Sequence, residues 1–223
     1  MRLARAAGLA LAALLLWPAL AFAQQKGEPG RFDHYVLALS WSPSYCEAMG
    51  ERAEPAQCAA PRPFAFVVHG LWPQYTRGWP ENCVNPAPFV PEPVLRAMLD
   101  IMPSRRLVLH QWRKHGTCDG ADSAAYFAEV RRAYERVTIP EAFRRLDDYR
   151  MVSPGEVEDA FRAANPGLTP DMIAIACDGR RLTEVRICMD RTLGFTPCEE
   201  VDRRACRASR VVMPPLREST GAK

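Results

Sequence analysis

Residues 110–118, His-Gln-Trp-Arg-Lys-His-Gly-Thr-Cys, hold two of the four histidines and a lysine. Because successive residues of an α-helix turn by ~100°, Lys114, Gln111 and His115 would lie about 40°, 100° and 140° from His110. One face of a predicted helix therefore carries two imidazoles, an ammonium group and an amide. Burial of this face would leave a charge and several hydrogen-bond donors without partners. A solvated face is the alternative, but the concentration of scarce side chains favours a functional site.

His69 is the third histidine, and it follows the apolar residues Phe66–Val68 and precedes Gly70. The pattern predicts that His69 ends a buried strand and that Gly70 lets the backbone turn, so that the imidazole projects into a cleft. A core histidine bonded to a backbone carbonyl is the alternative, and this segment alone favours it. The fourth histidine, His34, lies in a predicted strand, and we interpret it as structural.

Two or three imidazoles beside a lysine suit phosphoryl transfer on RNA, which carries its own nucleophile in the 2′-hydroxyl. A base must remove the proton of that hydroxyl, an acid must protonate the departing 5′-oxygen, and cations must stabilise the phosphorane. Histidine suits both proton transfers, because its pKa lies near neutrality. Zinc is the alternative, but His110 and His115 are five residues apart, not four, and the acidic residue of a zinc-protease helix is missing.

Three segments resemble the ribonuclease T2 family, in the same order along the chain. His69-Gly70-Leu71-Trp72-Pro73 resembles its first active-site segment, and residues 110–118 resemble the second, usually written H-E-W-x-K-H-G-T-C. Residues 35–46 resemble its first strand. The resemblance implies an α+β fold, in which helices pack on a central antiparallel sheet. It also implies four disulfides: Cys46–Cys58, Cys83–Cys118, Cys177–Cys206 and Cys188–Cys198.

The same resemblance implies roles for the candidate residues. His115 would be the general base and His69 the general acid. His110 would bind the phosphate, and Lys114 would stabilise the pentacoordinate state. The product would be a 2′,3′-cyclic phosphate and then, more slowly, a 3′-phosphate, without metal or other cofactor. Gln111 replaces the usual glutamate and loses its negative charge, which should lower the pKa of nearby histidines. We therefore expect an active enzyme with an altered pH profile.

RNA bases should stack on aromatic side chains near His69. Trp72, Gln74 and Tyr75 stand where the family has its first base pocket, and stacking tolerates any base, which fits a broad specificity. Core packing is an equally good interpretation of Trp72. For the second base the family often has an aromatic residue at the position that Leu107 occupies here.

Short strands interleaved with helices must position these side chains. Strands are predicted at residues 32–41, 64–68, 172–176 and 182–189. Helices are predicted at residues 93–102, 104–115 and 124–137, the last capped by Ser123. A further helix opens with a capping box of Ser153 and Glu156 around Pro154, and it ends near Asn165. Strands and helices without regular βαβ alternation also indicate an α+β fold.

Residues 1–23 have the pattern of a secretory signal peptide, with Arg2 and Arg5, an apolar run over 6–16 and the cleavage pattern Ala21-Phe22-Ala23. The run is shorter than the ~20 residues of a membrane span, so an uncleaved anchor is the weaker alternative. All eight cysteines follow it, and an even count in an exported chain indicates disulfides. We predict a periplasmic or secreted protein with one domain over 24–217, a disordered tail over 218–223 and no membrane attachment after cleavage.

Cleavage would lower the net charge from +3 to about +1, so that attraction for a polyanion must come from a local patch. The leading hypothesis is a monomeric, metal-independent endoribonuclease that cuts single-stranded RNA with broad base specificity. A secreted, non-catalytic RNA- or partner-binding protein on the same fold is the second hypothesis, supported by Gln111 alone. A metallohydrolase is the third, and it requires acidic ligands that the helix lacks.

Overall fold

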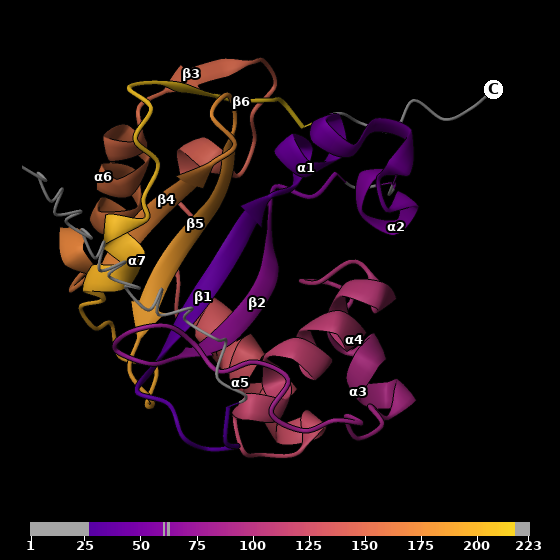
Figure 1. The fold of residues 1–223 in the computed structure, drawn as a ribbon. Coiled ribbons are helices and arrows are strands. Elements are labelled where there is room, and N and C mark those ends of the chain that lie inside the picture. The colour runs from indigo at the N-terminus through magenta and orange to yellow at the C-terminus, as the bar shows by residue number, and fades with distance from the viewer. Residues whose placement is uncertain (1–26, 60, 62, 217–223) are drawn as a thin grey trace, which may run out of the picture.

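The computed structural model describes residues 27–59, 61 and 63–216, so the predicted signal peptide and tail lie outside the described residues. Its main sheet has four antiparallel strands in the order β2-β1-β5-β4 (Figure 1). Their bounds are β1 His34–Trp41, β2 Phe66–Gln74, β4 Ile173–Cys177 and β5 Leu182–Met189. A smaller antiparallel sheet pairs β3, Arg150–Val152, with β6, Val211–Met213.

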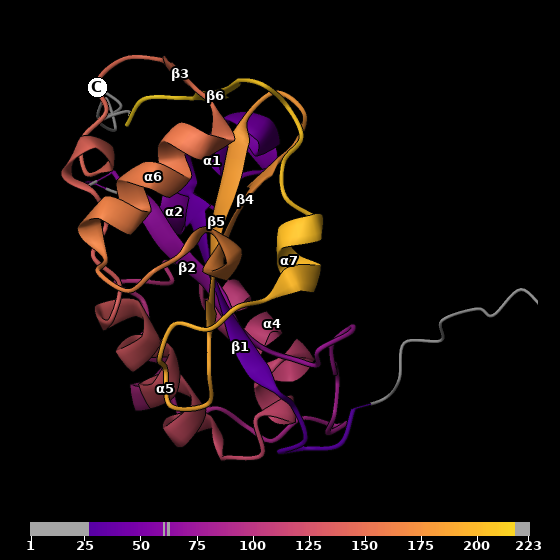
Figure 2. The same cartoon turned by 90° about the vertical axis from the view of Figure 1, so that its left-hand side faces the viewer.

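Helices lie at both edges of the main sheet. The α-helices are α1 Ser42–Met49, α2 Pro55–Cys58, α3 Glu92–Arg96, α4 Arg105–Lys114, α5 Ser123–Glu135, α6 Pro154–Ala164 and α7 Glu199–Arg203. Single 3₁₀ turns span Gly50–Arg52, Gly116–Cys118, Glu141–Phe143 and Pro170–Met172. Helices α3, α4 and α5 gather beside the β2 edge, whereas α6 and α7 pack near β4 (Figures 1 and 2). The predicted α+β fold, with helices packed on an antiparallel sheet, is confirmed.

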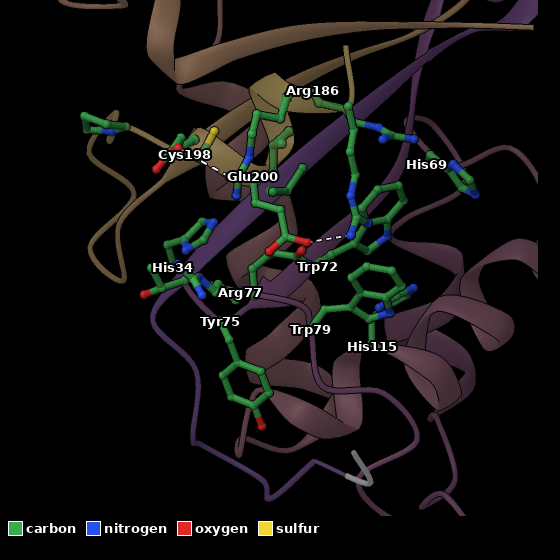
Figure 3. A pocket seen from close by; sticks show the side chains of 18 of the residues that line it. His34, His69, Trp72, Tyr75, Arg77, Trp79, His115, Arg186, Cys198 and Glu200 are labelled. Carbon is green, nitrogen blue, oxygen red and sulfur yellow. Dashed lines mark hydrogen bonds and ion pairs between the residues drawn. The ribbon is translucent and has the colours of Figure 1, made fainter. Parts of the chain in front are cut away.

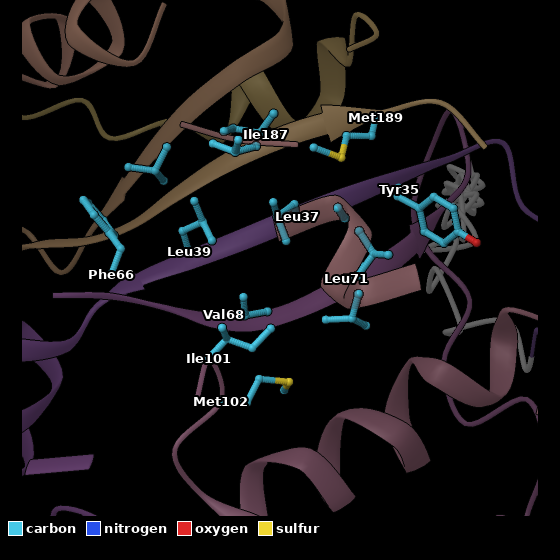
Figure 4. Close-up of a cluster of buried hydrophobic side chains, with 14 of the residues drawn as sticks. Tyr35, Leu37, Leu39, Phe66, Val68, Leu71, Ile101, Met102, Ile187 and Met189 are labelled. Carbon is cyan, nitrogen blue, oxygen red and sulfur yellow. The ribbon is translucent and has the colours of Figure 1, made fainter. Parts of the chain in front are cut away.

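The two faces of the main sheet differ in polarity, since successive strand residues point to opposite sides. Tyr35, Leu37 and Leu39 of β1 are buried in the core, beside residues of β2 and β5 (Figure 4). Ala38 and Ser40 point to the opposite face. The rings of Trp112, Tyr126, Phe127 and Phe161 from α4, α5 and α6 belong to the same core. The opposite face is therefore left to carry polar side chains.

The prediction for β5 is confirmed, β1 begins at His34 instead of residue 32, and β4 is displaced by one residue from its predicted bounds. The prediction for β2 is wrong at its end, because the strand continues through His69 to Gln74. Pairing along the whole of β1 holds these extra residues in the sheet. The sequence patterns missed the short pair β3 and β6.

The helix predictions are confirmed where a side chain caps the first turn. Ser104 caps α4 by accepting from the Leu107 amide, and Ser153 forms the predicted capping box with Glu156. The cap predicted at Ser123 is wrong, since Asp122 accepts from the Ala125 amide and Ser123 is the first helical residue. The helix predicted over 93–102 is shorter, because α3 ends at Arg96 and turns follow.

Four disulfides staple the fold, and all four pairs implied by the family resemblance are confirmed. They are Cys46–Cys58, Cys83–Cys118, Cys177–Cys206 and Cys188–Cys198. Two of them frame the polar face of the sheet. Cys83–Cys118 fixes the 3₁₀ turn that follows α4, and Cys188–Cys198 ties the start of α7 to β5. These cross-links restrict how far α4 and α7 can move from the sheet.

Candidate active site

A cavity of about 560 Å³ opens on the polar face of the main sheet, between β2, α4 and α7 (Figure 3). Every residue that the sequence assigned to catalysis or to base binding lines it. These residues are His69, Trp72, Gln74, Tyr75, His110, Gln111, Lys114 and His115. The structure thus brings together two segments that are about 40 residues apart in the chain.

A β-bulge aims His69 into this cavity. Val68 pairs with Leu39 of β1 and Gly70 pairs with Ala38, so that His69 is an extra residue without a partner on β1. A bulge of this kind redirects a side chain. The prediction that His69 ends a strand is therefore wrong. His69 lies inside β2, and the bulge, not a turn, directs its side chain into the cavity.

Gly70 is required for space rather than for a turn. A Cβ atom at this position would lie 2.3 Å from Gln111 Oε1 and 2.4 Å from Trp72 Nε1. Both distances are far inside van der Waals contact. The predicted role of Gly70 as a turning point is wrong, and its missing side chain instead allows α4 to approach β2 closely.

Trp72 lies between the two histidines that were predicted to transfer protons. Its ring centroid is 5.3 Å from that of His69 and 5.4 Å from that of His115. Its Nε1 donates to Gln111 Oε1 over 2.8 Å. Because Trp72 is only half-buried and lines the cavity, it belongs to the wall of the site and not to the main core.

Gln111 is 1% exposed, and its amide oxygen is committed to the indole of Trp72. The amide oxygen orients Trp72 without adding a negative charge to the site. The negative charge of the family's usual glutamate is therefore absent from the contact between α4 and β2.

His115 is 7% exposed and follows the last residue of α4 as its C-cap. Burial lowers its pKa to about 3, and the nearby Lys114, His69 and His110 add to the effect by disfavouring a positive charge. Its Nδ1 is buried and has no hydrogen-bond partner among the described residues. In this setting the imidazole is neutral and able to accept a proton.

His69 has the opposite environment. Its Nδ1 lies 2.5 Å from Oε1 of Glu184, a β5 carboxylate that is 7% exposed. Burial would raise the pKa of Glu184, but the hydrogen bond and charge of His69, together with Arg186, outweigh it and lower the pKa to about 2. Arg186 Nε donates to Glu184 Oε2 over 2.9 Å. An ionised carboxylate thus faces His69.

His110 and Lys114 form the more open side of the site. His110 is the more exposed of the two helix-side histidines. The part of its ring that is buried is the main cause that lowers its pKa, and the charges of Lys114 and Arg113 lower the pKa further. Lys114 Nζ lies 3.5 Å from Glu81 Oε2, at the rim of the cavity. These two side chains can meet an anion that enters between His69 and His115.

The far end of the cavity is walled by the loop after β2 and by α7. Trp79 lies there with the Arg204 guanidinium 5.0 Å from its ring centroid. Glu200 links the two elements, since it accepts from the Gly78 amide over 2.6 Å and from Arg204 over 2.5 Å. Tyr75 and Gln74 share this end of the cavity.

His34 also lines this end, with its Nε2 buried and without a hydrogen-bond partner among the described residues. Burial lowers its pKa, against the opposing charges of Asp33 and Glu200. The purely structural interpretation of His34 is therefore incomplete, because its side chain forms part of the cavity wall.

Sequence reasoning missed Trp79, Glu184 and Arg186. Glu184 and Arg186 alternate on a strand whose other residues are largely apolar, which is a signal for a polar face turned toward a site. Trp79 lies between Gly78 and Pro80 in a loop, where a large aromatic side chain is a candidate for ligand contact. Neither signal identifies the side chain that each residue contacts, because the contacting side chain comes from another part of the chain.

Metal-binding clusters and membrane-spanning helices were also sought among the described residues. Within the described ranges, no group of three or more histidine, cysteine, aspartate or glutamate side chains is arranged to hold a metal ion. The helices of the described part of the chain are also too short or too polar to cross a membrane.

The fold and the paired histidines define a nuclease-like site, and comparison with known proteins identifies its family. Residues 32–198 match the model of the Ribonuclease T2 family, and the chain belongs to that family. It is accordingly an enzyme of the endoribonuclease class. Among curated relatives, a ribonuclease of Aeromonas hydrophila is 43% identical over 193 residues, which cover 81% of this chain and 83% of the relative. Ribonuclease I of Escherichia coli K12 is 29% identical over 225 residues, covering 82% and 84% of the two chains.

Solved structures share the fold. The crystal structure of RNase NT in complex with 5′-AMP matches with a TM-score of 0.65 at 24% identity, over 83% of this chain and all of that one. The RNase-related protein from Calystegia sepium matches with a TM-score of 0.66 at 20% identity, over 84% and 99% of the two chains. At these identities the matches support the architecture alone.

Proposed function

We propose that this protein is a metal-independent endoribonuclease that cleaves single-stranded RNA by transphosphorylation. The single observation that supports it best is a pair of imidazoles in opposite electrostatic settings, placed on either side of Trp72 in one cavity. One is buried among cations and neutral, and the other faces a carboxylate. Such a pair separates the roles of base and acid.

In the first step His115 takes the proton of the ribose 2′-hydroxyl. The 2′-oxygen attacks phosphorus, a bond from the 2′-oxygen to phosphorus forms, and the bond to the 5′-oxygen breaks. His69 gives its proton to the departing 5′-oxygen. The product is a 2′,3′-cyclic phosphate. Hydrolysis to the 3′-phosphate follows with the roles exchanged, as His69 activates water and His115 protonates the 2′-oxygen.

Cations at the site would stabilise the charge that develops on the phosphorane. Lys114 and His110 stand on the α4 side, and Arg186 stands on the β5 side. Positive groups fixed in place before the reaction stabilise a transition state more effectively than mobile water does. An entering phosphodiester would in turn raise the lowered pKa of His115.

The base next to the reacting ribose would occupy the end of the cavity that holds Trp72, Gln74, Tyr75 and Trp79. Aromatic rings stack on every base, which supports a broad specificity. The four disulfides support an oxidising location outside the cytoplasm. We therefore propose a periplasmic or secreted monomer, made as a precursor that is cleaved after Ala23.

Digestion of RNA with and without EDTA, followed by end-group analysis, tests this function. We expect equal rates under both conditions and 2′,3′-cyclic ends that later become 3′-phosphates. The variants His69→Ala and His115→Ala should each lose on the order of 100- to 10,000-fold in rate. Loss of activity in EDTA would refute the metal-independent mechanism, and a fully active variant would remove that histidine from its role.

A further inference from the structure

We propose that Glu184 is a positioning residue of this reaction: it holds His69 protonated on Nδ1, so that Nε2 faces the departing 5′-oxygen. This inference rests on the proposed function, and it adds a residue from β5 to a site otherwise built on β2 and α4. It also gives the site a carboxylate, which α4 lacks because residue 111 is glutamine.

The contact between the two side chains is direct and sheltered. His69 Nδ1 and Glu184 Oε1 are 2.5 Å apart, and the side chain of Glu184 is 10% exposed. The second carboxylate oxygen is taken by Arg186, whose Nε and terminal nitrogen lie 2.9 and 2.8 Å away. Ser40 Oγ, on the neighbouring strand β1, donates to Oε1 over 3.4 Å. Glu184 is therefore fixed before any substrate arrives.

An ionised carboxylate only accepts hydrogen bonds, so its contact with Nδ1 requires a proton on that nitrogen. The other ring nitrogen, Nε2, then carries the proton that can be transferred. A histidine whose orientation and tautomer are fixed in this way donates along one direction, which favours a general acid.

Glu184 also places a negative charge next to His69. The charged or titratable side chains that face His69 are Glu184 and Arg186 from β5, His110 and Lys114 from α4, and His115 directly after α4. Glu184 is the sole acidic member of this group. Without it, an imidazolium at residue 69 would lie near Lys114 and Arg186 with no carboxylate in the group to balance its charge.

The fold explains why the carboxylate comes from β5. Glu184 pairs with Ser40 on β1, and β1 separates β5 from β2 in the sheet. Ser40 is a small residue, and the bulge turns His69 toward the same face, so the two longer side chains meet across β1. The amide of Gln111, in contrast, is engaged by Trp72 and carries no charge.

Glu184→Gln tests the proposal, because glutamine keeps the shape and removes the charge. A comparison of two substrates identifies the chemical step at which Glu184 acts. Cleavage of a dinucleotide requires a proton on the 5′-oxygen, whereas a ribonucleoside 3′-(4-nitrophenyl phosphate) releases a stable phenolate without one. We expect kcat for the dinucleotide to fall about 10- to 100-fold and kcat for the aryl ester to change less than about 3-fold.

The pH profile gives a second readout. Proton donation to the 5′-oxygen requires a positively charged imidazole, and Glu184→Gln removes the negative charge that lies 2.5 Å from it. The alkaline limb of kcat/KM for the dinucleotide should therefore move to lower pH in Glu184→Gln. Glu47→Gln is the matched control, because Glu47 is a partly buried carboxylate bonded to Arg181 over 2.9 Å outside the cavity. It should leave both substrates and the profile unchanged.

The ratio of the two rates cancels any loss of folded protein. Equal losses on both substrates would overturn the proposal, because they would show a general structural role. The unmodified protein offers an independent check by ¹⁵N NMR of the imidazoles: the neutral form of His69 should carry its proton on Nδ1, and a neutral form protonated on Nε2 would overturn the proposal. If the unmodified protein failed to cleave RNA, the proposed function itself would fall.

Discussion

The substitution Gly70→Ala tests whether close packing of α4 on β2 sets the geometry of the site. The added Cβ would lie 2.3 Å from Gln111 Oε1 and 2.4 Å from Trp72 Nε1. Neither neighbour can yield easily, because they are hydrogen-bonded to each other and Gln111 is 1% exposed. The clash must therefore displace the indole that lies between the two histidines proposed to transfer protons.

The expected loss in the free energy of unfolding follows from two effects. Overpacking of a closely packed site costs about 1–3 kcal/mol, and loss of the bond between Trp72 and Gln111 adds about 1 kcal/mol. Unfolding free energy should therefore fall by roughly 2–4 kcal/mol. Displacement of a catalytic group by about 1 Å costs on the order of 100-fold in rate, and Trp72 contacts both imidazoles. We expect a loss of that size in kcat.

Urea denaturation and RNA cleavage, measured on the same preparation, check this expectation. Gly155→Ala is a suitable control, since nothing lies within 4 Å of a Cβ at Gly155 in the first turn of α6. That variant should keep full activity and a stability equal to or slightly above that of the parent. A Gly70→Ala protein with unchanged kcat would refute the idea that this close approach positions the histidines.

Further predictions concern charge, stacking and pH. Gln111→Glu should shift the pH–rate profile to higher pH, because a carboxylate raises the pKa of nearby histidines, and an unchanged profile would count against this role. Trp79→Ala should weaken dinucleotide binding about 10- to 100-fold, and an unaltered KM would exclude stacking on this ring. His115 has a folded-state pKa of about 3 against 6.5 when unfolded, so the unfolded state binds more protons and stability falls as pH drops below 6.5. Between pH 6.5 and 4.5 this should cost about 2 kcal/mol. Urea midpoints should fall less steeply over this range in His115→Phe, and identical slopes would contradict the assignment.

Local features of this protein follow from its sequence alone. The capping box of Ser153 and Glu156 satisfies backbone groups within one helical turn, so its pattern is sufficient to start α6. The alternation of β5 and the spacing of His110, Lys114 and His115 likewise depend on the period of one element. The two segments proposed to form the active site were picked out from their own residues, and they line one cavity.

Tertiary structure decided everything that needs a partner from elsewhere in the chain. The bulge at His69 exists only in the register between β1 and β2, and the bond from His69 to Glu184 joins residues 115 positions apart. Burial beside Lys114, His69 and His110 gives His115 its low pKa, and Gly70 is required by a side chain on α4. Burial, register and the charges around a group depend on residues distant in the chain, whereas a sequence pattern reports only what one segment can form by itself.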